Sequence, residues 1–291
     1  MREARRALVL VNRRSRQGGQ GVDAALDVLR QGGLALDLES PGEPEHTGRL
    51  ILARRDEVDL VIVAGGDGTL NAATPALLET GLTLGILPTG TGNDLARTLK
   101  LPLDLAGAAG VIVAGRSQAI DVGMVNGQPF LNAATVGLSN EAARRLTGEV
   151  KQRWGPLGYP VTLVDAWRAS HPFDAAIEGE FGRERRRSIQ IVIGNGRHHG
   201  AGMTVAASAA IDDHALDVYS LDPQPWWRAV RLIPLLRLGA DHAPEGMWRT
   251  RTRRLRLETD RPLRIRTDGE PTTRTPAIFE VKAAALRVLV P

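Results

Sequence analysis

Residues 60–71 read LVIVAGGDGTLN, a run of apolar residues that ends in three glycines around one aspartate. The apolar run predicts a buried strand, and the spacing that follows predicts a helix over 70–80. Glycine lets the backbone approach a phosphate closely because it has no Cβ, and a helix N-terminus offers unpaired N–H groups to an anion. Thr69 or Asn71 could cap this helix, and Asp67 could hold Mg²⁺. Taken alone, a tight strand-to-helix turn explains the same glycines equally well.

A second loop of the same design follows in residues 85–97, which read GILPTGTGNDLAR. A predicted strand over 82–87 again ends in glycines and hydroxyl residues, and a short helix is expected over 93–99. Parallel strands place such loops at the same carboxyl edge of a sheet, where ligands bind in open α/β folds. Two neighbouring glycine-rich loops at one edge favour a phosphate-binding site over turns alone.

The first part of the chain alternates between strand and helix patterns. We expect strands at 7–11, 34–38, 60–64 and 82–87, and helices at 22–30, 46–55, 70–80, 93–99 and 105–114. Such alternation predicts βαβ units and an open, mostly parallel sheet that is covered by helices. We therefore expect an α/β domain over residues 1–121.

The character of the sequence changes after residue 118. Short strand candidates follow at 119–125, 129–135, 173–178, 188–193, 216–221, 253–258, 263–267 and 278–281, with helices expected at 159–169 and 226–238. Many short strands between turn signals predict a β-rich domain with an antiparallel, sandwich-like sheet over residues 122–291. The final run, 286–290, could return to the first domain. We expect the active site in the cleft between the two domains.

Residues 264–271 read RIRTDGEP. Asp-Gly between two strands is the strongest short hairpin signal, so a plain turn at Asp268 and Gly269 explains this segment well. A hairpin tip is also a suitable place from which to aim a carboxylate at a ligand. Glu270 could then act as a general base.

Composition narrows the class of protein. The 291 residues contain no cysteine, which excludes disulfides, thiolate metal sites and thiol nucleophiles. The net charge of +4 suits an anionic ligand or a membrane surface, and an aromatic content of 4% argues against nucleic acid as a partner. No signal peptide or membrane-spanning run is evident, so we expect a cytoplasmic protein that contacts the inner face of the membrane peripherally and transiently. Residues 226–237 combine tryptophan, aliphatic residues and arginine, which fits an interfacial membrane segment or a helix that covers a core.

The three motifs together resemble the diacylglycerol kinase-like lipid kinase family, in particular its bacterial branch of small soluble lipid kinases. The family's Gly-Gly-Asp-Gly-Thr motif stands at 65–69, its Pro-x-Gly-Thr-x-Asn-Asp motif at 88–94 and its Asp-Gly-Glu motif at 268–270. The resemblance covers nearly the whole chain in motif order. It implies a transferase of phospholipid metabolism, an ATP-dependent kinase that phosphorylates a lipid hydroxyl, with residues 1–121 as the nucleotide-binding domain and 122–291 as the lipid-substrate domain.

Carried over residue by residue, the resemblance implies Glu270 as the general base. It implies that the nucleotide is bound by Asn12, Ser40, Gly66, Asp67, Gly68, Thr69, Leu70, Asn71, Ala72 and Thr91. The chain departs from the family at Ala72, which replaces a glutamate, and in the loop after Asn12, where the family usually has proline.

Magnesium is expected at two places. Asp67, Asp94 and Asp121, all expected at loop ends near the proposed cleft, could organise a catalytic ion beside the nucleotide. The segment 210–217, AIDDHALD, resembles the family's loop for a structural ion, which implies the Asp213 carboxylate and the backbone carbonyls of Ala210 and Ala215 as ligands. His214 replaces the family's usual glycine there. The alternative for this loop is an exposed turn with two solvated aspartates.

Two other interpretations stay open. An NAD kinase-like enzyme would share the Gly-Gly-Asp-Gly-Thr motif and the two-domain plan, and a non-catalytic regulator that binds ATP or lipid would explain Ala72 and the altered first loop. The acceptor is not encoded in any motif, because lipid pockets are built from interchangeable aliphatic side chains. Diacylglycerol, phosphatidylglycerol, a monoacylglycerol and a sphingoid base all suit the sequence.

Overall fold

A computed structural model describes residues 5–12, 21–137, 170–196, 210–225 and 246–291, together with two short strands at 198–199 and 203–204. The chain forms two compact units, Met1–Val122 with Lys282–Pro291, and Gly123–Val281. The chain passes between the units within two strands, β5 (Ser117–Val125) and β18 (Ala277–Leu289). The helices predicted over 159–169 and 226–238 lie outside the described residues, as does the candidate membrane segment 226–237.

The first unit is built on a parallel sheet in the strand order β2-β1-β3-β4, with the end of β18 beside β4. The bounds are β1 Arg5–Val11, β2 Leu34–Glu39, β3 Leu60–Gly65 and β4 Thr83–Pro88. Val288 of β18 pairs in parallel with Leu84 of β4. The central strand β3 is buried along its whole length, as expected when helices cover both faces of a parallel sheet.

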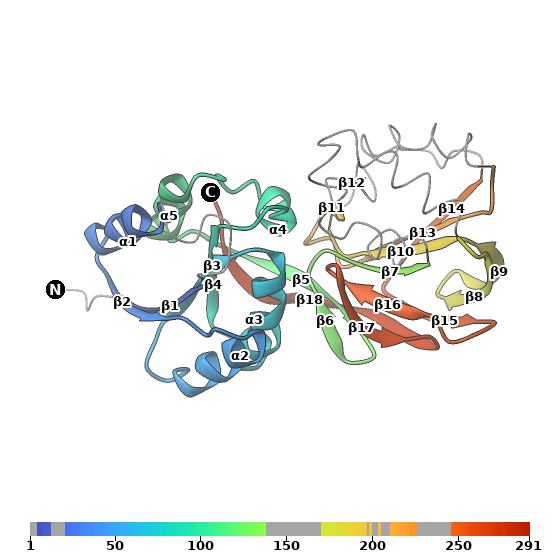
Figure 1. The fold of residues 1–291 in the computed structure, drawn as a ribbon, viewed down its shortest axis with the longest axis horizontal. Helices are drawn as coiled ribbons and strands as arrows, with labels where there is room; N and C mark the ends of the chain where they lie inside the picture. The colour runs from blue at the N-terminus through green and yellow to red at the C-terminus, as the bar shows by residue number, and fades with distance from the viewer. Residues whose placement is uncertain are drawn as a thin grey trace. The chain divides into compact units, whose positions relative to one another are not determined.

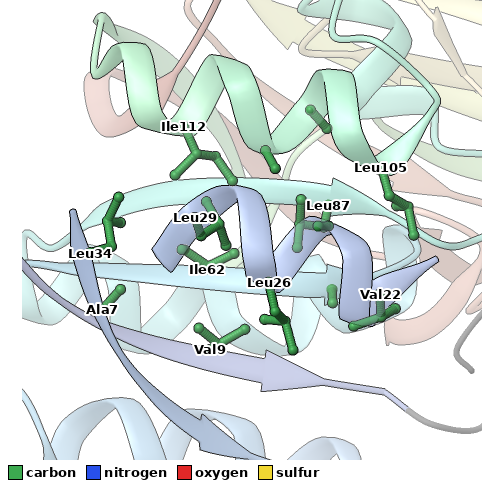
Figure 2. Close-up of a cluster of buried hydrophobic side chains, with 14 of the residues drawn as sticks. Ala7, Val9, Val22, Leu26, Leu29, Leu34, Ile62, Leu87, Leu105 and Ile112 are labelled. Carbon is green, nitrogen blue, oxygen red and sulfur yellow. The ribbon is translucent and has the colours of Figure 1, made fainter. Parts of the chain in front are cut away.

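Helices cover the two faces of this sheet in pairs, with α1 and α5 on one face and α2 and α3 on the other (Figure 1). Their bounds are α1 Val22–Gln31, α2 Pro44–Ala53, α3 Asp67–Thr80, α4 Asp94–Thr98 and α5 Leu105–Ala114. Apolar residues of α1 recur at helical spacing, which gives the helix one buried stripe. Figure 2 shows Leu26, Leu29 and Ile112 among the side chains that fill the space over Val9 and Ile62 of the sheet.

The second unit is antiparallel and β-rich. One of its sheets has the order β14-β13-β10-β7-β16-β17, and a second run has the order β18-β15-β8-β9. The further bounds are β6 Gln128–Phe130, β7 Ala133–Gly137, β8 Phe173–Gly179, β9 Gly182–Ser188, β10 Gln190–Gly194, β11 His198–His199, β12 Met203–Thr204, β13 Leu216–Leu221, β14 Met247–Thr252, β15 Arg254–Thr259, β16 Arg264–Thr267 and β17 Glu270–Arg274. A shared core contains Phe130, Phe173 and Phe279. The predicted fold class, a parallel α/β unit followed by an antiparallel β-rich unit, is confirmed.

Several predicted boundaries differ from the structure. The strand expected over 129–135 is divided into β6 and β7 by Leu131 and Asn132, and the runs expected at 278–281 and 286–290 are parts of the single strand β18. Helix α3 begins at Asp67, earlier than the apolar spacing indicates. Within the described ranges, no helix has the length and apolarity needed to cross a membrane.

Candidate active site

Three loops of the first unit come together where β1, β3 and β4 end. The Asn12 side-chain Nδ2 donates to Thr69 Oγ1 at 3.0 Å, which joins the loop after β1 to the first turn of α3, directly after β3. The Thr89 backbone N–H donates to the Gly65 carbonyl at 3.1 Å, which joins the loops after β3 and β4. Parallel pairing therefore brings the predicted nucleotide residues of these loops to one edge of the sheet, where ligands bind in open α/β folds.

Gly66 and Gly90 bring the backbones of the loops after β3 and β4 close together. A Cβ built on Gly90 would lie 2.5 Å from the Gly66 Cα, and one built on Gly66 would lie 3.0 Å from the Gly90 Cα. The shorter contact excludes any side chain larger than hydrogen at Gly90, and a side chain at Gly66 would force the backbone at Gly90 to move. These glycines are therefore required by the approach of two backbones, in addition to any role with a ligand.

The N-terminus of α3 has no side-chain cap. Its N-cap residue is Gly66, in an extended conformation. The expectation that Thr69 or Asn71 caps the helix is wrong, because both lie inside it, and the Thr69 hydroxyl instead accepts the hydrogen bond from Asn12. A Cβ built on Gly68 would meet nothing within 4 Å. The first turn of α3 therefore has no side-chain cap and has room beside Gly68. An uncapped helix N-terminus is a common phosphate-binding arrangement.

The loop after β4 is held in shape by Asn93. This residue has a left-handed backbone with φ 52°, and its side chain accepts from the Gly90 N–H at 3.0 Å and donates to the Gly90 carbonyl at 2.9 Å. Arg97 Nε donates to the Gly92 carbonyl at 3.0 Å. Thr91 lies exposed at the tip of this loop.

Two carboxylates flank Gly92. A Cβ on Gly92 would lie 3.0 Å from Asp67 Oδ2 and 3.8 Å from Asp94 Oδ2. Asp67 Oδ1 also accepts the Leu95 N–H at 3.3 Å, which orients the carboxylate. Carboxylate oxygens are the ligands that Mg²⁺ prefers, so Asp67 and Asp94 stay the predicted ligands of a catalytic ion.

Asp121 plays a different part. We expected it at a loop end, and this is wrong, because it lies inside β5 and is 1% exposed. Its Oδ1 accepts the Ala284 N–H of β18 at 2.7 Å. Ala284 interrupts the regular strand with a left-handed backbone of φ 48°. Asp121 therefore accepts a backbone N–H at a position where the strand β18 is irregular. Of the three aspartates, Asp67 and Asp94 are the ones at the glycine-rich loops.

Thr89 is a residue that the motifs did not single out. It is 1% exposed, and its hydroxyl has no hydrogen-bond partner among the described residues. Buried hydroxyls are normally satisfied, so an unsatisfied one within a glycine loop supports a missing ligand. Ser40, in contrast, is exposed directly after the outermost strand β2, two strands away from β3.

In the second unit, Glu270 is the exposed first residue of β17. It pairs with Thr267 across a two-residue turn in which Asp268 and Gly269 have φ values of 49° and 89°. Positive φ at both positions is the geometry of a type I′ hairpin turn. The hairpin interpretation of the Asp-Gly-Glu sequence is therefore confirmed. The role of Glu270 as a general base stays a prediction, and the turn places this residue at the exposed start of β17.

Asp268 anchors this turn. Its Oδ2 accepts the Leu131 N–H at 2.8 Å, and its Oδ1 accepts the N–H groups of Asn132 and Ala133 at 2.8 and 3.1 Å. The Asp268 N–H donates to the Ala133 carbonyl at 2.9 Å. These bonds fix the hairpin tip, and with it the backbone of Glu270, to the segment that precedes β7.

The donors of the loop 210–217 do not fit the predicted structural magnesium site. Asp213 Oδ2 accepts the Ala210 N–H at 2.9 Å, Oδ1 accepts the Ala215 N–H at 3.2 Å, and an Arg251 nitrogen lies 2.6 Å from Oδ2. Both oxygens of the one predicted side-chain ligand therefore already contact hydrogen-bond donors, and the guanidinium lies at the oxygen that a divalent ion would need. Throughout the described ranges, no three Asp, Glu or His side chains are grouped as metal ligands.

Asp217 is the last residue of this segment and already lies on β13. Burial raises the pKa of Asp217 above its ordinary value, and the nearby Asp213 raises it further, while Arg251 and Arg249 oppose the shift. The loop and the two strands that follow it thus carry a compact group of opposite charges.

Comparison with known proteins agrees with the motifs and the geometry. The model of the diacylglycerol kinase catalytic domain matches residues 6–125, and the model of the YegS C-terminal NAD kinase beta sandwich-like domain matches residues 133–290. A protein of Pseudomonas savastanoi pv. phaseolicola named probable lipid kinase YegS-like is 33% identical over 293 residues, which cover 99% of this chain and 94% of the relative.

The chain belongs to the diacylglycerol kinase-like family. A member from Klebsiella pneumoniae, also named probable lipid kinase YegS-like, is 29% identical over 279 residues, which cover 92% of this chain and 90% of that one. A crystal structure of a candidate diacylglycerol kinase from Bacillus anthracis str. Sterne has a TM-score of 0.83 at 25% identity and covers 100% of this chain and 97% of that one. The family fold therefore extends over both units.

Proposed function

We propose that this protein is a lipid kinase that transfers the γ-phosphate of ATP to the hydroxyl group of a membrane lipid, such as diacylglycerol or phosphatidylglycerol. The observation that carries the proposal is the uncapped first turn of α3, which has room at Gly68 beside the contact between Gly66 and Gly90. Family membership supports the same reaction class.

The glycine loops would bind the nucleotide. The N–H groups of the first turn of α3, within the predicted set Gly66–Ala72, would hold phosphate oxygens through hydrogen bonds and the positive end of the helix. Asn12 orients Thr69 in this turn, and Thr91 is exposed for contact with the nucleotide. Asp67 and Asp94 would hold Mg²⁺, which neutralises charge on the phosphates.

Phosphoryl transfer then requires little covalent chemistry from the protein. The lipid hydroxyl oxygen attacks the γ-phosphorus, the bond from this phosphorus to the oxygen that bridges to the β-phosphate breaks, and ADP leaves. Glu270 takes the hydroxyl proton as the general base. Its position in an anchored hairpin supports this role, because proton transfer depends on a held geometry. The lipid substrate implies peripheral and transient contact with a membrane surface.

The test is transfer of labelled γ-phosphate from ATP, with Mg²⁺, to a total-lipid extract and then to defined acceptors. We expect Glu270→Gln to lose about 10²–10⁴-fold in turnover, the usual contribution of a general base, while it still binds ATP. Glu280→Gln is the matched control, because Glu280 is also an exposed glutamate on a strand of the second unit. Loss of ATP binding in Glu270→Gln would assign Glu270 a structural role instead.

An NAD kinase-like enzyme is the second candidate. The model that matches residues 133–290 is described as an NAD kinase beta sandwich-like domain, and NAD belongs in the same assay as an acceptor. Label in NADP and in no lipid would favour this candidate. ATP binding without transfer to any acceptor would favour a non-catalytic regulator.

A further inference from the structure

The loop 210–217 receives a cation from a neighbouring strand, the guanidinium of Arg251 on β14. Both oxygens of the Asp213 carboxylate accept backbone N–H groups of the loop, and Arg251 lies 2.6 Å from Oδ2. A second, longer bond runs from the same Arg251 nitrogen to the Asp213 carbonyl at 3.5 Å. We propose that Arg251 takes the place of a divalent metal ion in this loop, so that the loop keeps its structure without metal.

Strand pairing places Arg251 between two carboxylates. In the antiparallel pair β13 and β14, Asp217 stands directly opposite Arg251, and cross-strand partners share one face of a sheet. Asp213 lies shortly before the start of β13 and contacts the same guanidinium. Arg251 therefore supplies positive charge to both carboxylates from a position that the sheet determines.

A metal ion would compete with Arg251 for the same oxygen. Divalent ions bind carboxylate oxygens at about 2.0–2.6 Å, so an ion on Asp213 Oδ2 would lie close to the guanidinium. The Asp213 side chain is 18% exposed, and like charges repel more strongly where water is partly excluded. Arginine stays charged at any physiological pH, so this internal cation is always present.

The test is the thermal unfolding midpoint without nucleotide, measured in EDTA and in Mg²⁺ or Ca²⁺ at matched ionic strength. The variants are Arg251→Met, which keeps an apolar stem but removes the charge, and Arg251→Lys, which keeps the charge. Arg253→Met is the matched control on an exposed arginine. The wild type and each variant are also prepared with the additional substitution Asp213→Asn. The change of midpoint with Mg²⁺ or Ca²⁺ that disappears in the Asp213→Asn protein is the part that arises from metal binding at this loop.

In the wild type we expect Mg²⁺ and Ca²⁺ to cause no change of midpoint that depends on Asp213. Arg251→Met should lower the midpoint in EDTA by about 2–6 °C, and Mg²⁺ or Ca²⁺ should restore most of this loss, because the two carboxylates then accept a metal ion. Arg251→Lys should retain part of the stability, and Arg253→Met should match the wild type.

Three results would overturn the proposal. They are an Asp213-dependent rise of the wild-type midpoint with Mg²⁺ or Ca²⁺, an Arg251→Met midpoint equal to that of Arg253→Met, and a loss in Arg251→Met that neither ion restores. If Arg251→Met does not fold, the wild type and Arg251→Lys test the proposal. Neither protein should show an Asp213-dependent change of midpoint with Mg²⁺ or Ca²⁺, and such a change in either would overturn the proposal. The measurement uses neither ATP nor lipid, so its outcome is separate from that of the kinase assay.

Discussion

Glycines 66, 68 and 90 serve two different physical purposes. At Gly66 and Gly90 a side chain would collide with the backbone of the facing loop, so substitution there disturbs the fold itself. At Gly68, in the first turn of α3, a methyl group would meet no protein atom within 4 Å. A substitution at Gly68 can therefore test ligand binding without disturbing the fold.

We predict that Gly68→Ala weakens ATP binding by about tenfold, equivalent to about 1.4 kcal/mol, because its Cβ occupies the space where a phosphate approaches the helix. The free energy of unfolding should stay the same or rise, since alanine is favoured over glycine in a helix by about 0.5–1 kcal/mol. Isothermal titration with ATP and denaturant unfolding measure the two effects.

Gly110→Ala provides the control for that pair of measurements. Gly110 lies in α5, and a Cβ there would also meet nothing within 4 Å. This variant should gain similar stability and bind ATP as the wild type does. Unchanged ATP affinity in Gly68→Ala would argue against phosphate binding at the first turn of α3.

At the scale of elements, the hairpin of β16 and β17 depends on one carboxylate. Asp268 accepts three backbone N–H groups of the segment 131–133, and a buried donor that loses its acceptor costs about 1–3 kcal/mol. Glu270 lies two residues along the chain, so its direction depends on this anchor. Asp268 is thus a positioning residue for the proposed base.

We predict that Asp268→Ala lowers kcat by up to about 10²-fold, the effect of a small misplacement of a reacting group, with little change in KM for ATP. In the Glu270→Gln background the same substitution should have almost no further effect, because residues that act as a unit are not additive. Steady-state kinetics of the two single variants and the double variant measure this. An undiminished loss in the double variant would show that Asp268 acts independently of Glu270.

The elements differ in how well the sequence predicts them. The βα loops follow from alternation, since an apolar strand with a glycine-rich end is a local pattern of the amino-acid sequence. Strand β9 reads GRERRRS, and this charged edge strand lacks the alternation of apolar and polar residues by which a strand is recognised in a sequence. It forms a strand because it pairs with β8. The contact of Asp213 with Arg251 links residues 38 positions apart. It arises from the register of β13 and β14, which no local pattern contains.

At the scale of the whole molecule, the two ends of the chain build the same unit. Residues 282–291 group with the first 122 residues, although the sequence pattern of 286–290 favours neither domain. Leu286, Val288 and Leu289 are at most 1% exposed, and Leu289 belongs to the core that α1 and α5 cover. The glycine-rich loops after β3 and β4 therefore belong to a sheet that includes the C-terminal end of β18, which follows the second unit in the sequence.

We predict that deletion of residues 282–291 unfolds the first unit and leaves the second largely intact. Burial of a large aliphatic side chain contributes about 1.5–3 kcal/mol, so the loss of three is comparable to the total stability of a domain, about 5–15 kcal/mol. The core of the second unit, which contains Phe130, Phe173 and Phe279, includes no residue of the deleted segment. Hydrogen exchange should therefore report lost protection in β3 and β4 and retained protection in β10 and β13, together with lost ATP binding. Arg287→Ala, a substitution at an exposed position of the same strand, should change neither the hydrogen exchange of β3 and β4 nor ATP binding. Retained protection of β3 and β4 after the deletion would contradict a first unit that depends on both ends of the chain.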